Sequence, residues 1–269
     1  MNQIFFDKER KEEMKKILSV FLILALVLGM TACGSTDEGT GEDGGDAKTY
    51  IVATEPTFPP FEFVDETTSE IVGFDIDLIK AIAADQGFEV EIQQLGFDAI
   101  TGSISGGIVD IGASGMSITP ERLEEVDFSD PYIDAGLVIA VGEDNTEISG
   151  VDDLKGKVCA AQIGTTGAAK AQELMDQGII KEVKVFNTVD VVMQELATKG
   201  VDCVINDKPV TEAYISKMEG IKIVGDVLDS DSYGFAVKKG NTELIELINA
   251  GLANVKANGT YDELVAKYF

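Results

Sequence analysis

One stretch of the chain joins a strand-like segment to a helix start and carries a cation at an unusual place. Residues 112–122 read Gly-Ala-Ser-Gly-Met-Ser-Ile-Thr-Pro-Glu-Arg and follow an apolar segment, residues 108–111, that predicts a strand. Thr119 suits a helix N-cap and Pro120 the first helical position. Arg122 then falls in the first turn, where the helix dipole disfavours a cation. Its guanidinium could bind both oxygens of a carboxylate beside free backbone N–H groups, or it could be a solvated surface residue.

The composition argues against several classes of function. The 269 residues include 48 Asp and Glu against 21 Lys and Arg, which gives a net charge of −27 at pH 7. Such a charge repels phosphate backbones, so we expect no nucleic-acid partner. The sequence contains no His. The commonest general base and the commonest metal ligand are therefore missing, which weakens any hydrolase or zinc-site interpretation.

The N-terminal region predicts export. Residues 17–30 are apolar except for one Ser and one Gly, and a Lys pair precedes them. This run is too short for a comfortable membrane span but fits the core of a signal peptide. Residues 1–13 are mixed in charge, which is unusual for the start of a signal peptide, and we interpret them as an upstream extension before a start at Met14.

The end of this segment, Met-Thr-Ala-Cys at residues 30–33, resembles the bacterial lipobox, although Met stands where Leu is usual. The resemblance implies that residues 1–33 are a signal peptide and that Cys33 is lipidated. The alternative is ordinary cleavage after Ala32, which leaves Cys33 as a free thiol. Residues 34–48 are rich in Gly, Asp and Glu and cannot build a core, so they predict a flexible acidic tether. We therefore expect an exported lipoprotein that its lipid anchor holds at the membrane, facing the extracellular side or the periplasm.

From residue 49 onwards the apolar pattern alternates between the strand and the helix period. The expected elements are a strand at 50–53, a Pro-rich turn at 55–63, a helix over 76–83 that ends at Gly87, a strand at 90–92 and a short helix over 97–104. Alternation of this kind predicts a mainly parallel sheet with helices on both faces.

The pattern then restarts after an extended run at 137–141. The expected elements are strands at 158–161, 183–185, 201–205 and 233–237, helices over 166–175, 189–196 and 244–255, and a last helix that a capping box opens at Thr260. These elements predict two lobes, one built from residues 49–139 and 231–269 and the other from residues 140–230. Two chain connections would then lie side by side and form a hinge.

Seven motifs in this region resemble, in order and spacing, the solute-binding proteins of bacterial ABC transporters that take polar amino acids. They are Phe-Pro-Pro-Phe-Glu-Phe (58–63), Val-Gly-Phe-Asp-Ile-Asp-Leu (72–78), Ser-Ile-Thr-Pro-Glu-Arg (117–122), Asp-Phe-Ser-Asp-Pro-Tyr (127–132), Asp-Leu-Lys-Gly-Lys (153–157), Gly-Thr-Thr-Gly (164–167) and Asn-Gly-Thr-Tyr (258–261). The resemblance implies an α/β fold of the two-lobed periplasmic-binding-protein type (type II), with a two-stranded hinge. It also implies closure on a free L-amino acid, delivery to a transporter permease, and no catalytic residue, cofactor or metal.

The resemblance assigns the carboxylate of the amino acid to Arg122, helped by Ser117 and by the N–H of Thr166. Thr165 and Thr166 open a helix, and a helix N-terminus is an anion site. Asp207 is implied as the acceptor for the ligand ammonium, although Asp before Lys-Pro could also cap a helix.

The carbonyl oxygen of Gly115 is implied as a second acceptor for the ammonium. Phe58 and Phe97 are implied as aromatic walls on either side of the ligand side chain. Each Phe taken alone could equally be a core residue.

Two residues bear on which amino acid is bound. Glu55 stands where an acidic residue of the family often reaches the ligand side chain, and Gln162 could contact the same group. A carboxylate suits a guanidinium or ammonium by charge and an amide by hydrogen bonding. We expect a basic amino acid, arginine ahead of lysine, with glutamine close behind. A dehydratase on the same fold, with Glu55 as its general acid or base, is a further alternative, and the ligand-sensing domain of a receptor is another.

Overall fold

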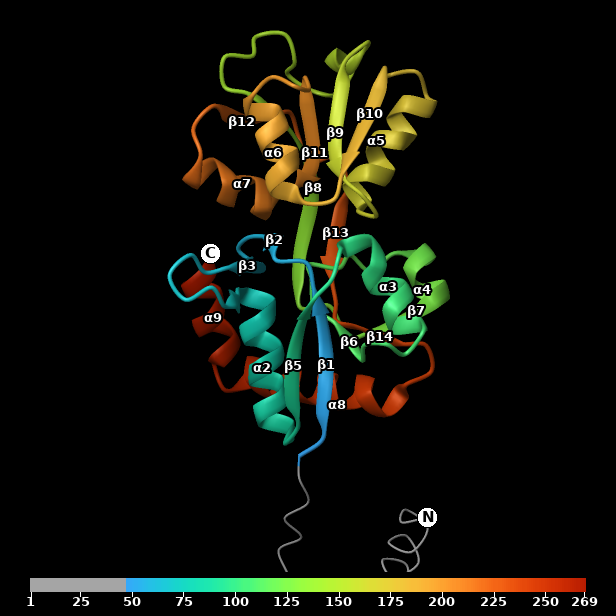
Figure 1. Cartoon of the computed structure of the whole chain (residues 1–269), viewed down its shortest axis with the longest axis vertical. Coiled ribbons are helices and arrows are strands. Elements are labelled where there is room, and N and C mark those ends of the chain that lie inside the picture. Colours follow the sequence, from blue (N-terminus) through green and yellow to red (C-terminus); the bar gives the residue numbers. More distant parts are fainter. Residues whose placement is uncertain (1–46) are drawn as a thin grey trace, which may run out of the picture. The chain divides into compact units, whose positions relative to one another are not determined.

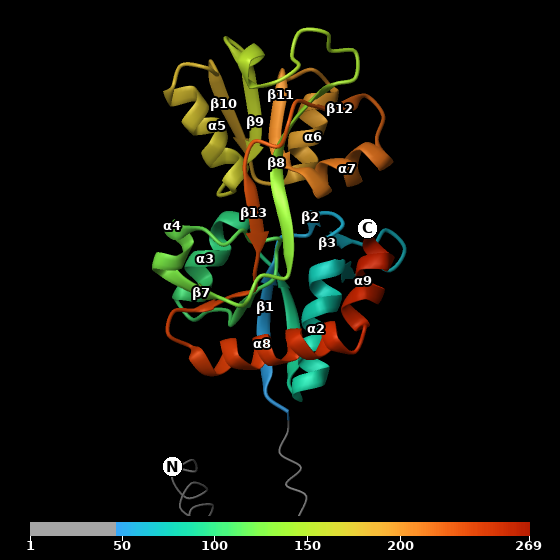
Figure 2. The ribbon, with the colours of Figure 1, turned by 180° about the vertical axis from the view of Figure 1, so that it is seen from behind.

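The computed structural model describes residues 47–269, so the predicted signal peptide, Cys33 and most of the predicted tether lie outside the described residues. Residues 47–269 contain two large sheets, each flanked by helices (Figures 1 and 2). We call the part around the first sheet lobe 1 and the part around the second sheet lobe 2. The two-lobed α/β organisation predicted from the sequence is confirmed. In this part of the chain, no helix has the length and apolar character needed to cross a membrane.

The sheet of lobe 1 has the strand order β5-β1-β6-β14-β7, and β5, β1 and β6 are parallel. Its strands are β1 (Thr49–Thr54), β5 (Glu89–Gln94), β6 (Ile111–Gly112), β7 (Val126–Phe128) and β14 (Ala236–Lys238). The helices of this lobe are α2 (Phe74–Gln86), α3 (Phe97–Ser105), α4 (Pro120–Glu125), α8 (Thr242–Ala257) and α9 (Thr260–Tyr268). A small antiparallel sheet precedes α2 and consists of β2 (Thr57–Phe58), β3 (Glu62–Val64) and β4 (Ile71–Val72).

The helix α2 follows directly from the spacing of its apolar residues. Ile76, Ile79 and Ile82 recur at the helical period and are all fully buried. The helix ends at Gly87, whose φ of 74° lies in the left-handed region that glycine adopts without strain. Both the helix and its end are therefore as predicted.

The sheet of lobe 2 has the strand order β10-β9-β11-β8-β12, in which β10, β9 and β11 are parallel and β8 is antiparallel to its neighbours. Its strands are β8 (Ile133–Gly142), β9 (Val158–Gln162), β10 (Glu182–Phe186), β11 (Cys203–Asp207) and β12 (Ile221–Val224). The helices of this lobe are α5 (Thr166–Asp176), α6 (Val189–Ala197) and α7 (Lys208–Lys217), and a 3-10 turn covers Val151–Leu154. The sequence predicted neither β12 nor α7.

The two lobes are joined by a pair of antiparallel strands, as predicted. The first part of β8 pairs with β13 (Ser230–Tyr233), from Ile133 opposite Tyr233 to Gly136 opposite Ser230. The second part of β8, residues 137–141, then pairs with β11 inside lobe 2. Residues 137–139, which the sequence assigned to lobe 1, therefore belong to the second sheet. Figure 1 shows β8 and β13 side by side between the lobes.

The strand predicted at residues 108–111 is wrong in extent, because β6 begins only at Ile111. Ile108 is 67% exposed. Its N–H, and that of Val109, bond to the carbonyl oxygen of Ser103, so these residues continue the turn that ends α3 and do not pair in the sheet.

Two predictions near the C-terminus are also corrected. Residues 233–237 are not one strand: β13 ends at Tyr233 and β14 begins at Ala236, because the chain passes here from the inter-lobe pair into the sheet of lobe 1. The last helix has Gly259 as its N-cap, not a capping box at Thr260. The side chain of Asn258 instead accepts the N–H of Thr260 at 3.0 Å.

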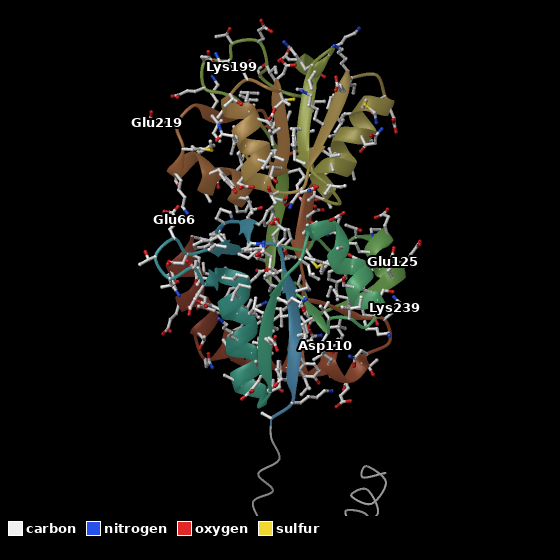
Figure 3. The ribbon with its side chains drawn as sticks, in the orientation of Figure 1. Glu66, Asp110, Glu125, Lys199, Glu219 and Lys239 are labelled. Atoms are coloured by element: carbon white, nitrogen blue, oxygen red, sulfur yellow. The ribbon has the colours of Figure 1, made fainter. Side chains whose placement is uncertain are left out.

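Charged side chains lie mainly on the periphery of both lobes. Glu66, Glu125 and Glu219 are exposed and point away from the sheets (Figure 3). Because exposed charges keep their hydration, this distribution tolerates the strongly negative net charge. The few buried carboxylates are therefore exceptions.

Candidate functional site

The predicted site residues gather where strands of both sheets end. Glu55 follows β1, Gly115 and Ser117 follow β6, Gln162 ends β9 and Asp207 ends β11. Open parallel sheets bind ligands at the carboxyl ends of their strands, where the loops leave a crevice. Several hydrogen bonds described below join these residues across the two lobes.

Arg122 lies in the first turn of α4, which starts as predicted. Thr119 is the N-cap and its hydroxyl accepts the N–H of Arg122 at 3.2 Å. The guanidinium donates from Nη1 to the carbonyl oxygen of Ser117 at 2.8 Å and from Nη2 to that of Gly164, in lobe 2, at 3.1 Å. It also lies 5.2 Å from the ring centroid of Phe97. Of its five N–H groups, two are thus used on carbonyl oxygens.

The charge of Arg122 has no carboxylate partner within ion-pair distance among residues 47–269. Burial lowers the pKa of Arg122, and the charges of Asp207 and Asp231 oppose that shift. An arginine titrates so far above neutral pH that it remains a cation. A partly buried cation with unused N–H groups is suited to binding an anion.

The start of α5 lies opposite Ser117. Thr165 is its N-cap: the hydroxyl accepts the N–H of Ala168 at 3.1 Å and donates to the carbonyl oxygen of Gln162 at 2.7 Å. The hydroxyl of Thr166 lies 3.5 Å from that of Ser117. The structure therefore brings Ser117, Thr165 and Thr166 together with a helix N-terminus, which favours an anion.

The two lobes come very close at Gly164. A Cβ atom at this position would lie 3.0 Å from the Cα of Asp98 in lobe 1, and the φ of Gly164 is 77°. The left-handed conformation favours glycine, and any side chain here would force the backbone of Asp98 to move by a few tenths of an ångström.

Asp207 is buried, with 4% exposure, and its Oδ1 accepts the hydroxyl of Tyr233 at 2.5 Å. It occupies the N-cap position of α7, but its side chain makes no capping hydrogen bond. Burial raises its pKa to about 6, against the hydrogen bond from Tyr233, while nearby Asp231 adds to the rise and Arg122 lowers it. The contact with Tyr233 was missed from the sequence, where the two residues are 26 positions apart.

Gly115 has a φ of 52°, and a Cβ there would lie 2.5 Å from the ring of Phe58. Its N–H donates to Oδ2 of Asp75 at 2.8 Å. Tyr132 donates to the same oxygen at 2.6 Å. The peptide at Gly115 is therefore held by a buried carboxyl group that the sequence analysis did not single out.

The two aromatic residues pack in different clusters. Phe58 is 6% exposed and its ring centroid lies 6.4 Å from that of Tyr233. Phe97 is 8% exposed and begins α3, beside the guanidinium of Arg122. Each ring is nearly buried, so both packing and ligand contact are compatible with its position.

Glu55 and Gln162 contact each other across the lobes, and each is 3% exposed. Nε2 of Gln162 donates to Oε2 of Glu55 at 2.9 Å and to the carbonyl oxygen of Asn187 at 3.0 Å. Thr57 donates its hydroxyl to the same Glu55 oxygen at 2.7 Å. Burial raises the pKa of Glu55, and the hydrogen bonds from Thr57 and Gln162 oppose that rise.

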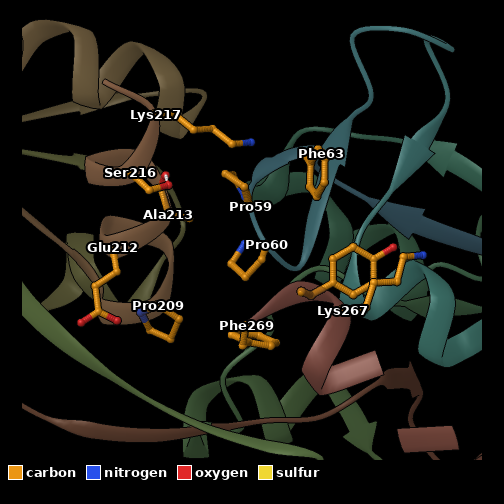
Figure 4. A pocket seen from close by; sticks show the side chains of 11 residues that line it. Pro59, Pro60, Phe63, Pro209, Glu212, Ala213, Ser216, Lys217, Lys267 and Phe269 are labelled. Atoms are coloured by element: carbon orange, nitrogen blue, oxygen red, sulfur yellow. Dashed lines mark hydrogen bonds between the residues drawn. The ribbon is translucent and has the colours of Figure 1, made fainter. Parts of the chain in front are cut away.

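A separate groove of about 550 Å³ lies between the turn after β2, helix α7 and the end of α9 (Figure 4). It contains none of the predicted site residues. Lys217 on its rim lies 4.9 Å from the ring centroid of Phe63, and Lys267 bonds to Asp77 at 2.7 Å. Within residues 47–269, no group of His, Cys, Asp and Glu is arranged to hold a metal ion.

Comparison with known proteins identifies the family. Residues 50–269 match the family model described as bacterial extracellular solute-binding proteins, family 3. The arginine-binding extracellular protein ArtP of Bacillus subtilis (strain 168) is 31% identical over 95% of this chain and 98% of its own length.

Two solved structures of the same type superpose on the chain. An ancestral arginine-binding protein bound to arginine is 43% identical with a TM-score of 0.79, over 82% of this chain and 98% of that chain. An ancestral arginine-binding protein bound to glutamine is 43% identical with a TM-score of 0.78, over 82% of this chain and 97% of that chain. The fold is thus the two-lobed periplasmic-binding-protein type expected from the motifs, and the chain belongs to the bacterial extracellular solute-binding proteins of family 3.

Proposed function

We propose that this protein binds a polar amino acid outside the cytoplasm and delivers it to an ABC importer, with arginine as the first candidate ligand and lysine as the second. Its family and the arginine-binding relatives support the amino-acid class. The choice of arginine rests on one observation, the carboxylate of Glu55 with 3% exposure at the contact between the lobes. A buried carboxylate is costly unless a cation is paired with it. Thr57 and Gln162 give Glu55 two hydrogen bonds but no positive charge, which a guanidinium would supply.

The groups common to all amino acids would be bound at the other end of the site. Arg122, the hydroxyl of Ser117 and the N-terminus of α5 suit the carboxylate. Asp207 and the carbonyl oxygen of Gly115 suit the ammonium, since both are acceptors. A pKa of about 6 keeps most Asp207 carboxylates ionised at neutral pH, as this role requires.

The side chain of the ligand would lie between Phe58 and Phe97 and end at Glu55 and Gln162. Gln162 already donates both N–H groups of its Nε2, one to Glu55 and one to Asn187. What remains at this end of the site are acceptor oxygens, the Oε1 atoms of Glu55 and Gln162. A guanidinium, which only donates, matches such a surface better than an amide, which must also accept.

Glutamine is the alternative to these two basic amino acids. An ancestral arginine-binding protein has been solved with glutamine bound, at 43% identity to this chain. The amide nitrogen of glutamine could donate to Glu55, although its oxygen would then need a donor that Gln162 does not have free.

Closure of the lobes is the proposed mechanism. A ligand that contacts Arg122 and Asp207 at once would bridge the lobes, and only such differential contacts can shift an open form toward a closed one. The strand pair β8 and β13 would absorb the movement. The permease would then receive the closed, loaded form.

The proposal includes a lipid anchor at Cys33, which lies outside the described residues. Replacing Cys33 with Ala in the producing cell should release the protein from the membrane fraction. Equal membrane retention of the variant and the wild type would remove the anchor from the proposal.

The ligand is tested by isothermal titration calorimetry of residues 34–269, unfolded and refolded to remove any carried ligand, against each of the twenty amino acids. Arginine or lysine should bind tightly and glutamine at least tenfold more weakly. The opposite order would keep the amino-acid class and make glutamine the ligand. If no amino acid binds, the enzyme alternative with Glu55 as its base becomes the better hypothesis.

A further inference from the structure

Thr57 is a lobe 1 residue that is hydrogen-bonded to two helices of lobe 2, α6 and α7. It begins β2, which lies on the side of lobe 1 that faces lobe 2 in Figures 1 and 2. Its hydroxyl accepts the N–H of Val189 at 3.0 Å, and its carbonyl oxygen accepts the hydroxyl of Tyr214 at 2.9 Å. No ligand atom is needed for either bond, so these contacts depend on lobe closure alone.

The bond to Val189 caps a helix from the opposite lobe. Val189 is the first residue of α6, and Thr188 in the N-cap position makes no capping hydrogen bond with its side chain. The first N–H groups of a helix have no partner within the helix and need one from elsewhere. Thr57 supplies that partner only while the lobes are together, so opening exposes the N–H of Val189 to water.

The bond from Tyr214 fixes the second helix. Burial raises the pKa of Tyr214, with the charges of Asp190 and Glu55 adding to the rise, so its hydroxyl stays protonated and can donate. Tyr214 lies on α7, which begins directly after Asp207. Thr57 is thus linked to the helix that follows the proposed ammonium acceptor.

The same hydroxyl of Thr57 also contacts Glu55. It donates to Oε2 of Glu55 at 2.7 Å, and a hydroxyl has only one proton to donate. The carboxylate therefore orients the hydroxyl so that its lone pairs face Val189. In this way the residue proposed to recognise the ligand side chain is connected to a bond that forms only on closure.

From these contacts we propose that Thr57 is a closure latch, a positioning residue that couples Glu55 to helices α6 and α7 and so sets how long the ligand stays bound. The inference rests on the proposed function for its kinetic consequence, but the latch itself does not depend on which ligand is bound.

The kinetic test uses stopped-flow binding of the amino acid with the highest affinity in calorimetry. Thr57→Val keeps the size of the side chain and removes the hydroxyl, whereas Thr57→Ser keeps the hydroxyl. Thr57→Val removes the bonds of the hydroxyl to Val189 and to Glu55, and only the bond to Val189 crosses the lobes. We therefore expect it to release the ligand roughly 3- to 10-fold faster, the factor that corresponds to one typical inter-lobe hydrogen bond, with an association rate within about twofold of wild type. Thr57→Ser should dissociate at nearly the wild-type rate.

The matched control is Thr67→Val, because Thr67 is an exposed threonine of the same lobe. It should behave as wild type. Adding Tyr214→Phe to Thr57→Val should speed release further, since it removes the second bond to lobe 2. An unchanged dissociation rate in Thr57→Val, or a change confined to the association rate, would overturn the latch.

A second measurement separates the latch from the proposed function. Hydrogen exchange at the Val189 amide, followed both without added amino acid and at saturating amino acid, should be faster in Thr57→Val than in wild type, Thr57→Ser or Thr67→Val. Equal exchange in all four proteins would overturn the latch even if an amino acid binds. Failure of every amino acid to bind, with faster exchange in Thr57→Val, would sink the proposed ligand class and leave the latch standing.

Discussion

Two groups of buried carboxylates in this protein differ in which lobe supplies their partners. Glu55 in lobe 1 accepts a hydrogen bond from Gln162 in lobe 2 at 2.9 Å. Asp207 in lobe 2 accepts one at 2.5 Å from Tyr233, at the lobe 1 end of β13. Both carboxylates therefore belong to the contact between the lobes.

The second group lies entirely within lobe 1. Glu62 and Asp75 are both fully buried. Glu62 accepts the hydroxyl of Ser114 at 3.0 Å, and Asp75 accepts the N–H of Gly115 at 2.8 Å. Burial raises the pKa of both groups, that of Asp75 to about 7, and the charge of Asp75 raises that of Glu62 further.

A raised pKa and deep burial are therefore shared by both groups and do not separate them. Their hydrogen-bond partners distinguish the two groups, because bonds across the lobes change on closure and bonds within one lobe do not. We expect substitutions in the first group, and at Arg122 beside it, to act on binding, and substitutions in the second group to act mainly on stability.

The largest expected effect is on binding. Arg122→Ala should weaken ligand affinity by about 10³-fold, because at least two charge-assisted hydrogen bonds are lost, while the unfolding midpoint changes little. Calorimetry and thermal unfolding measure the two quantities. The exposed Lys199→Ala serves as a control for the loss of a positive charge. Near-wild-type affinity in Arg122→Ala would show that the site is misplaced.

The second group should give the largest effect on stability. Asp75→Ala leaves the N–H of Gly115 and the hydroxyl of Tyr132 without their acceptor, which should lower the free energy of unfolding by about 2–4 kcal/mol. Urea unfolding followed by circular dichroism gives the value. Asp207→Ala, which removes only the acceptor of Tyr233, should cost less stability. If Asp207→Ala were the more destabilising of the two, the distinction between the groups would fail.

A smaller effect is expected on ligand choice. Glu55→Gln should weaken arginine binding by roughly 10- to 100-fold and glutamine binding much less, because only arginine loses a charge partner. Competition calorimetry with both amino acids compares the losses, and Glu66→Gln at the surface is the matched control. Equal losses for the two ligands would remove the reason to prefer arginine.

Stability should also depend on pH. The pKa of Asp75 rises from 3.8 to about 7 on folding, so the folded protein holds this proton more tightly than the unfolded chain does. Its contribution to stability is thus fully present below about pH 4 and is lost as the pH rises through about 7. Asp207, with a folded pKa of about 6, and Glu62 contribute with the same sign.

Thermal unfolding between pH 4 and 8 tests how stability changes with pH, because this range runs from near the unfolded pKa of Asp75 to above its folded pKa. The unfolding temperature of wild type should fall across that range, and Asp75→Asn should flatten the fall. The exposed Glu66→Gln should leave it unchanged. A slope that is identical in wild type and Asp75→Asn would assign the dependence to other groups.

Local patterns in the sequence were sufficient to predict the helices that are determined by residues close together in the chain. The buried isoleucines of α2 repeat at the helical period, and the N-cap of α4 is a Thr before a Pro. The strand β12 was missed because its sequence, Ile-Lys-Ile-Val, is only four residues long and offers little alternation to detect. Helix α7 was missed because only Val210 and Thr211 of its ten residues are buried.

The contacts within the candidate site could not be predicted from local patterns. Gln162 and Glu55 are 107 positions apart, and Val189 and Thr57 are 132 apart. Motif spacing named the residues, but it carries no information on which atoms meet once the lobes close. The buried Asp75 was quoted only as part of a motif, because its role depends on the peptide at Gly115, 40 positions away.

The close approach at Gly164 suggests a substitution that would favour the open conformation of the protein. A Cβ at this position would lie 3.0 Å from the Cα of Asp98, so an added methyl group would crowd the contact between the lobes in the closed form. Gly164→Ala should therefore favour a wider molecule even at saturating ligand, which small-angle X-ray scattering would detect as a larger radius of gyration than in wild type. An unchanged radius would mean that the loop gives way. One added carbon atom thus offers a way to study the open protein, at a residue whose carbonyl oxygen accepts a hydrogen bond from Arg122.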